Sequence, residues 1–116
     1  MTSILKNKNC LITGATGGIG KEIAKEFAKN SCNLFLTSTN NVKLLKLKNQ
    51  LKKINRNIKI EFLATDLLIK ENIQNLLNNI KEKNFSIDII VNSAGIFMIK
   101  SIQQSTIDDY DKCMNL

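Results

Sequence analysis

The 116-residue sequence contains no His and no Trp, and aromatic residues make up only 5% of it. Without His, and with no two cysteines in the close spacing of a metal-ligand motif, it offers no residue set suited to a structural zinc site. The few aromatic residues also leave no stacking platform of the kind that binds single-stranded nucleic acid. Cys10, Cys32 and Cys113 are too widely spaced for a disulfide framework, so we expect reduced, partly buried packing residues.

Acidic residues are missing from one long stretch of the chain. The sequence has 17 Lys and Arg against 10 Asp and Glu, a net charge of +7, yet no acid lies between Glu26 and Glu61. A general preference for lysine on solvated helix faces is one interpretation of the surplus, and attraction to an anionic partner is another. Lysine usage alone does not account for the missing acids.

Long hydrophobic runs are missing as well. No apolar stretch reaches the roughly 18 residues that span a bilayer, and residues 1–8 lack the apolar segment of a secretory signal peptide. These absences predict a soluble protein, which we expect to be cytoplasmic.

Short apolar segments alternate with longer segments of helical periodicity. The four segments that have the length and composition of β-strands are residues 9–13, 33–37, 58–63 and 87–91. Helices are indicated between them by three apolar stripes: Ile19, Ile23, Ala24, Phe27 and Ala28; Leu44, Leu47, Leu51 and Ile54; and Ile73, Leu76, Leu77 and Ile80. A last helical segment is expected over 105–116. Such alternation predicts an α/β fold with a doubly wound parallel sheet.

The third and fourth predicted strands differ in pattern. In residues 58–63, apolar side chains alternate with Lys59 and Glu61, which is typical of a strand at the edge of a sheet. Residues 87–91 (IDIIV) are nearly continuously apolar, as in a strand covered by helices on both faces. We therefore expect the third strand to be outermost and the fourth to be central.

A glycine cluster, TGATGGIG, joins the first strand to the first helix at residues 13–20. Gly14 allows a tight turn, while Gly18 and Gly20 let the backbone approach a phosphate and let the helix pack close to the sheet. The N-terminus of the helix adds free N–H groups with partial positive charge. An ordinary glycine-rich turn is the alternative, but this placement between strand and helix favours a dinucleotide site. No Gly-Lys-Ser/Thr ends the cluster, so it is not a Walker loop.

This cluster resembles the TGxxxGIG motif of the classical short-chain dehydrogenases/reductases. Three further matches follow in the family's order: Asp66 after the third strand, NSAG (residues 92–95) after the fourth, and Asn115 in the sequence MNL. The resemblance implies an incomplete Rossmann-type sheet of about four strands in the order 3-2-1-4, with helices on both faces, whose fourth strand the family's fifth strand would cover. It also implies that residues 1–116 are the N-terminal part of one NAD(P)-binding domain.

The resemblance further implies roles for individual residues. The cofactor pyrophosphate is expected on the loop formed by Gly14, Ala15, Thr16, Gly17, Gly18, Ile19 and Gly20. Asp66 and Leu67 are expected to bound the adenine ring, although a turn or helix-capping role is open for Asp66. Asn92, Ala94 and Gly95 are expected near the cofactor ribose, with Ser93 replacing the family's second Asn. Asn115 matches the Asn of the Asn-Ser-Tyr-Lys catalytic tetrad, which positions a water, or is a chance match in an Asn-rich chain.

The end of the second strand bears on the choice of cofactor. Family members that prefer NAD have an acid there, whereas this chain has Thr37, Ser38, Thr39 and Asn40, with Lys43 one turn later. The family's usual phosphate-binding bases are absent, because position 17 is Gly and position 39 is Thr. We expect NADP as the cofactor, with NAD possible.

The catalytic Ser and the Tyr-x-x-x-Lys pair of the family have no counterpart here. Tyr110 is the sole Tyr, and Met114 stands four residues after it. The 116-residue chain itself is therefore expected to bind a dinucleotide without reducing a substrate, as the N-terminal fragment of a reductase.

The predicted function is the cofactor-binding half of an NADP(H)-dependent oxidoreductase acting on a small carbonyl/alcohol substrate. The resemblance is nearest to 3-oxoacyl-[acyl-carrier-protein] reductases, and the full-length form is expected to be a homo-oligomer. The alternative is a non-catalytic dinucleotide-binding or regulatory module. A specific nucleic-acid partner is not expected, since no groove-reading motif is present.

Overall fold

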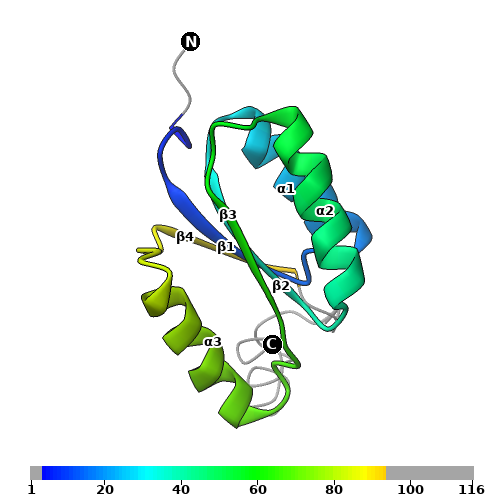
Figure 1. Ribbon diagram of the computed structural model, residues 1–116, viewed down its shortest axis with the longest axis vertical. Helices are drawn as coiled ribbons and strands as arrows, with labels where there is room; N and C mark the ends of the chain where they lie inside the picture. Colours follow the sequence, from blue (N-terminus) through cyan, green and yellow to red (C-terminus); the bar gives the residue numbers. More distant parts are fainter. Residues whose placement is uncertain (1–3, 94–116) are drawn as a thin grey trace, which may run out of the picture.

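The computed structural model describes residues 4–93, which form four strands and three helices in strict alternation (Figure 1). The strands are β1 (Asn9–Thr13), β2 (Asn33–Ser38), β3 (Ile60–Ala64) and β4 (Ile89–Asn92). The helices are α1 (Gly18–Lys29), α2 (Asn41–Ile54) and α3 (Lys70–Glu82). Within this part of the chain no helix is long and apolar enough to cross a membrane. The predicted helix over 105–116 lies outside the described residues.

All strand pairs are parallel, and the sheet order is β3-β2-β1-β4. In Figure 1 the sheet is seen close to edge-on, with α1 and α2 on one side and α3 on the other. This arrangement confirms the doubly wound α/β fold and the strand order expected from the sequence. Because parallel strands end at the same edge of a sheet, the loops that follow β1, β2 and β3 are brought together there with Ser93, which follows β4.

The two faces of the sheet carry separate hydrophobic cores. On one face, strand residues such as Ile12, Leu34 and Leu36 pack with α1 and α2. On the other, Leu11 and Phe35 pack with α3 and with Phe85, whose ring meets that of Phe35 edge-on at 5.7 Å. Successive strand residues point to opposite faces, so one nearly continuous apolar strand supplies both cores.

The helical stripes are only partly buried. In α1 the fully buried positions are Gly20, Ala24 and Ala28, whereas the side chain of Ile19 is 62% exposed. Ile19 lies in the first turn of the helix, above the glycine loop, where the sheet does not cover it. Leu77 and Ile54 are also largely exposed rather than part of the core.

Two strands begin later than the sequence pattern predicted, because side chains replace the first ladder hydrogen bonds. Before β3, the Lys59 N–H donates to Asn33 Oδ1 at 2.9 Å. Before β4, the Asn9 N–H donates to Asp88 Oδ2 at 2.9 Å. The strands therefore start at Ile60 and Ile89 instead of residues 58 and 87.

The expectation of a central, doubly covered fourth strand stays a prediction, because the structure describes residues 4–93 alone. Within residues 4–93 β4 pairs with β1 alone, and the Ile90 side chain is 65% exposed. In this part of the chain β4 is the end of the sheet opposite β3.

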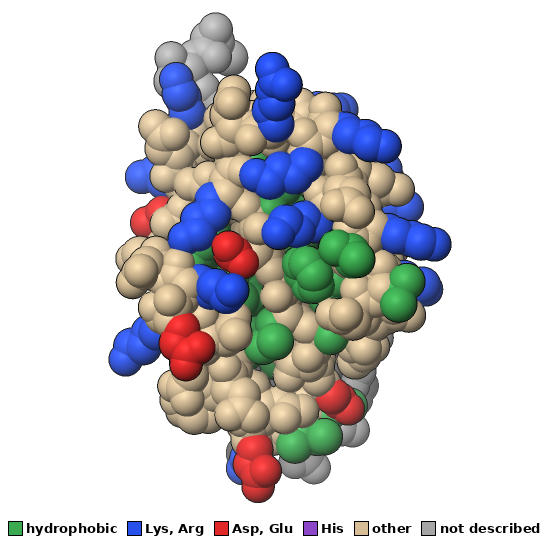
Figure 2. All heavy atoms as spheres, in the orientation of Figure 1, with side chains coloured by type: hydrophobic (Ala, Val, Ile, Leu, Met, Phe, Trp, Pro, Cys, Tyr) green, Lys and Arg blue, Asp and Glu red, His purple; other side chains and the backbone are tan. Residues whose placement is uncertain are grey.

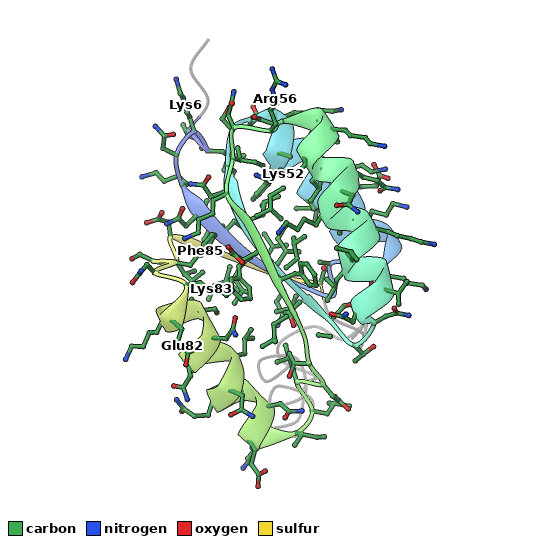
Figure 3. All side chains as sticks on the ribbon, in the orientation of Figure 1. Lys6, Lys52, Arg56, Glu82, Lys83 and Phe85 are labelled. Carbon is green, nitrogen blue, oxygen red and sulfur yellow. The ribbon has the colours of Figure 1, made fainter. Side chains whose placement is uncertain are left out.

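Lysine side chains lie near the edge of β3 that no other strand of residues 4–93 pairs with. Lys52 Nζ donates to the Ile58 carbonyl at 2.5 Å, and Lys59 Nζ donates to the Lys83 carbonyl at 2.6 Å. Figure 3 shows Lys52 reaching this edge from α2 and Lys83 from the segment after α3, and Figure 2 shows basic side chains spread over the same half of the molecule. Charged side chains on an edge strand oppose pairing with a second chain. Part of the lysine surplus thus has a structural role.

Cys10 and Cys32 are buried free thiols, as the sequence predicted, and Cys113 lies outside the described residues. Burial raises the pKa of Cys10 from 9.0 to about 12, with a further contribution from Cys32. Burial likewise raises the pKa of Cys32, to about 11. Both thiols therefore stay protonated and unreactive at neutral pH.

Thr37 carries a hydroxyl that is fully buried and has no hydrogen-bond partner among the described residues. Leaving a buried hydroxyl unpaired costs about 1 to 3 kcal/mol. Thr37→Val is therefore expected to raise the free energy of unfolding by about 1 kcal/mol, measured by denaturant titration.

The matched control for this prediction is Thr13→Val on the neighbouring strand. Thr13 Oγ1 donates to Asn92 Oδ1 at 2.8 Å, so this change breaks a hydrogen bond and is expected to cost about 1 kcal/mol. Equal destabilisation by the two variants would contradict the assignment of Thr37 as unpaired.

Candidate functional site

The glycine loop is a tight turn that begins at the end of β1. Gly14 has a φ of 60°, in the left-handed region that favours glycine. The Ala15 N–H donates to the Thr37 carbonyl at 3.1 Å, and the Gly17 N–H donates to the Gly14 carbonyl at 3.1 Å. These bonds hold the loop against β2 and turn the chain directly into α1.

Gly20 is required for the close packing of α1 on this loop. A Cβ at Gly20 would overlap the Gly14 carbonyl oxygen and would lie 2.7 Å from Ser93 Oγ. Helix, loop and the segment after β4 therefore meet at a point where no side chain fits. The sequence indicated this close approach through the spacing of the glycines.

The N-terminus of α1 faces solvent with its donors available. Gly17, Gly18 and Ile19 are exposed, and a Cβ at Gly18 would have no atom within 4 Å. Within residues 4–93 the N–H groups of Gly18 and Ile19 have no hydrogen-bond partner, no side chain caps the helix, and its first turn has no acid. Such a helix end is suited to bind an anion, because its free N–H groups and its dipole both favour negative charge.

The segment after β4 closes the other side of the loop. The Ser93 N–H and hydroxyl both donate to the Thr13 carbonyl, at 3.3 and 2.5 Å. The Asn92 side chain is held by the hydroxyl of Thr13. Ser93, which replaces an Asn in the family motif, thus occupies the small space beside Gly20 and ties the end of β4 to the end of β1.

The end of β2 contributes neutral polar groups. Ser38 is half-buried and its hydroxyl accepts a hydrogen bond from the Asn40 N–H at 3.2 Å, while Thr39 is exposed. Asn40 caps α2, since its Oδ1 accepts from the Lys43 N–H at 3.0 Å. This cap determines where the first turn of α2, with Lys43, begins.

The end of β3 places Asp66 and Leu67 at the same edge of the sheet. Asp66 Oδ1 accepts from the Leu68 N–H at 3.0 Å, so one carboxylate oxygen takes the turn role left open by the sequence. Its carbonyl accepts from Asn72 Nδ2 at 3.0 Å. The Leu67 side chain is buried in the core beside α3, which leaves its backbone as the part that a ligand could contact.

The fold brings the described members of the predicted site together at one edge of the sheet, and their roles in binding stay a prediction. These members lie at the carboxyl ends of the four strands: Gly14, Ala15, Thr16, Gly17, Gly18, Ile19, Gly20, Ser38, Thr39, Asp66, Leu67 and Asn92. Ala94, Gly95 and Asn115 lie outside the described residues. No group of His, Cys, Asp and Glu suited to a metal ion occurs among residues 4–93.

One feature of the site is not indicated by the sequence motifs. A cavity of about 310 Å³ lies between the glycine loop and α2, lined by Thr16, Lys21, Lys43, Lys46, Leu47 and Gln50. Of its three lysines, the sequence placed only Lys43 near the predicted site. The acid-free stretch between Glu26 and Glu61 was the available signal, because it contains the whole α2 wall of this cavity.

The chain is similar in sequence to known oxidoreductases. An uncharacterized oxidoreductase of Staphylococcus epidermidis is 29% identical over 112 residues, which are 97% of this chain and 46% of that protein. The 3alpha-hydroxysteroid dehydrogenase of Mediterraneibacter gnavus is 29% identical over 116 residues, 100% of this chain and 46% of that protein. The chain thus spans about half the length of the curated relatives it matches.

The fold has counterparts among solved structures. L-sorbose reductase from Gluconobacter frateurii, solved with NADPH and L-sorbose, superposes with a TM-score of 0.76 at 24% identity, over 95% of this chain and 41% of that one. A family profile described as short chain dehydrogenase matches residues 8–116, nearly the whole chain. The chain therefore belongs to the short-chain dehydrogenase family.

Proposed function

We propose that this chain is the cofactor-binding part of an NADP(H)-dependent oxidoreductase that interconverts a carbonyl and an alcohol. The observation that carries the proposal is the open N-terminus of α1, where exposed Gly17 and Gly18 leave backbone donors accessible. Family membership and the agreement of four separate motifs at one edge of the sheet support it.

The residues present fit a dinucleotide. Gly18 leaves open space where a side chain would otherwise stand, and the first turn of α1 has no acid to repel a pyrophosphate. The exposed Ile19 side chain gives an apolar surface beside those donors. Gly14 through Gly20 would hold the pyrophosphate, and Asp66 and Asn92 would contact the adenosine and ribose parts.

The described residues would then bind the cofactor and orient it. The α1 N-terminus stabilises the negative charge of the pyrophosphate, and the bonds from Ser93 to the Thr13 carbonyl keep the end of β4 in place beside it. When bound, the cofactor supplies the hydride. Asn115, outside the described residues, would position a water for proton transfer, and the proton donor itself is expected beyond the residues of this chain.

The preference for NADP rests on the end of β2. Ser38 and Thr39 are neutral and can donate to a phosphate, whereas an acid at this place would repel the 2′-phosphate. Substrate and assembly are finer parts of the proposal: a small carbonyl compound, with 3-oxoacyl groups on acyl-carrier protein as the first to test, and a homo-oligomeric full-length enzyme.

Direct titration tests the cofactor assignment. We expect the purified chain to bind NADPH at micromolar or lower concentration and NADH at least about tenfold more weakly, because a charged phosphate contributes about 1.4 kcal/mol or more. Isothermal titration calorimetry measures both. Binding of neither nucleotide would contradict the proposed function, whereas tight binding without turnover in the full-length protein would favour the non-catalytic module.

A further inference from the structure

We propose that the cavity between the glycine loop and α2 binds a phosphate monoester, and that its ligand is the 2′-phosphate of NADP(H), held by Lys43 with Lys21 and Lys46. The proposal rests on the proposed function and assigns the residues that select the cofactor. It places the phosphate-binding cations on α1 and α2 instead of at positions 17 and 39.

The first argument is the composition of the cavity wall. Three of its six lining residues are lysines, two others carry a hydroxyl and an amide (Thr16 and Gln50), and none is acidic. Leu47 is buried and forms an apolar part of the wall. Ligand sites combine such a concave, partly apolar surface with a few convergent polar groups, and about 310 Å³ is at the lower end of their range.

The second argument is that these cations lack partners. Within residues 4–93 the ammonium groups of Lys21, Lys43 and Lys46 make no salt bridge and no hydrogen bond. The acids of α1 pair with other lysines, Glu22 with Lys25 and Glu26 with Lys29, each at 3.5 Å. Three positive charges around one cavity repel each other, and a dianion among them would remove that repulsion.

The third argument is the position of the cavity relative to the loop. Thr16 belongs to the glycine loop and also lines the cavity, so a ligand on the loop is next to the lysines. Lys43 follows the Asn40 cap at the end of β2, the part of the fold where family members that prefer NAD have an acid. In Figure 1, α1 and α2 lie side by side on one face of the sheet, which lets Lys21 and Lys46 face the cavity from different helices.

The test compares NADPH and NADH binding in Lys43→Gln and in the double variant Lys43→Gln/Lys46→Gln. We expect NADPH affinity to fall about tenfold for the single variant and about 100-fold for the double variant, because each change removes one charge-assisted contact. NADH affinity should change less than about twofold in both, since NADH has no 2′-phosphate. Lys43→Arg keeps the charge and should retain NADPH affinity within a few fold.

Lys53→Gln is the matched control, because Lys53 is an exposed lysine of the same helix outside the cavity. It lowers the net charge by the same amount and should leave NADPH affinity unchanged. If the lysine variants lose as much affinity for NADH as for NADPH, or if Lys53→Gln loses as much NADPH affinity as Lys43→Gln, the proposal is wrong. Neither result would contradict the proposed dinucleotide site.

A second arm distinguishes the source of the phosphate. In the wild-type chain, 2′-AMP should compete with NADPH more strongly than inorganic phosphate does, and the double variant should lose this difference. If inorganic phosphate binds in the cavity and is lost in the double variant while NADPH affinity is unchanged, the 2′-phosphate assignment is wrong. If the wild type binds neither NADPH nor NADH, the proposed function fails together with this inference.

Discussion

Gly20→Ala is expected to lower the free energy of unfolding by about 3 kcal/mol, the upper end of the usual cost of overpacking. The added methyl group would overlap the Gly14 carbonyl oxygen and would also press on Ser93 Oγ at 2.7 Å. The first of these atoms is backbone, so relief requires α1 to move away from β1. Alanine favours helix by about 1 kcal/mol over glycine, which is too small to offset the overlap. Denaturant unfolding followed by circular dichroism measures the change.

Gly18→Ala is the control for this prediction, since it makes the same chemical change two residues earlier. Its Cβ would meet no atom within 4 Å, so stability should be unchanged or slightly higher. Similar stabilities for the two variants would show that α1 can shift at no cost, and the close approach of helix and loop would then not be a constraint.

Gly18→Asp is expected to reduce the affinity for NADPH and NADH alike by about 100-fold or more, because it places a carboxylate where the pyrophosphate is proposed to bind. The fold should not suffer. The space at Gly18 is open, and an acid in the first turn of a helix is stabilising by about 0.3 to 1 kcal/mol. Calorimetric titration and a thermal melt on the same sample separate the two effects.

Gly18→Asn carries a side chain of the same size without the charge, and it should retain most of the affinity that Gly18→Asp loses. If Gly18→Asp binds both dinucleotides as tightly as the wild type, the glycine loop is not the pyrophosphate site. If Gly18→Asn and Gly18→Asp lose the same affinity, steric exclusion and not charge is the cause.

Part of the packing around the glycine loop could be predicted from the sequence. The pattern TGATGGIG between a strand and a helix predicted a tight turn and a close helix, and the positive φ of Gly14 and the packing at Gly20 agree with it. The pattern did not indicate that a second group, the hydroxyl of Ser93 at the far end of the described chain, also excludes a side chain at Gly20. That contact depends on β4 lying beside β1.

The first residues of β3 and β4, and the exposure of the Ile19 side chain, could not be predicted from the sequence pattern. Alternation in residues 58–63 and the apolar run in residues 87–91 predicted strand starts at 58 and 87, but the Asn33 and Asp88 side chains accept from the first backbone donors. Ile19 continues the apolar period of α1 and is nevertheless exposed, because the sheet ends beneath the helix start. Periodicity reports which residues share a face and does not report where that face is covered.

The amino-acid sequence by itself determined the order of strands and helices, the glycine turn and the absence of acids from residues 27–60, because these depend on local periodicity, backbone freedom and composition. Only the tertiary structure decided what that absence means. Lys52 and Lys59 bind the carbonyl oxygens of Ile58 and Lys83, whereas Lys43 and Lys46 line a cavity with Lys21, although four of these five belong to one acid-free stretch. For the lysines of α2 the difference arises because this helix packs against both α1 and β3, so that its first turns and its last turn face different surroundings.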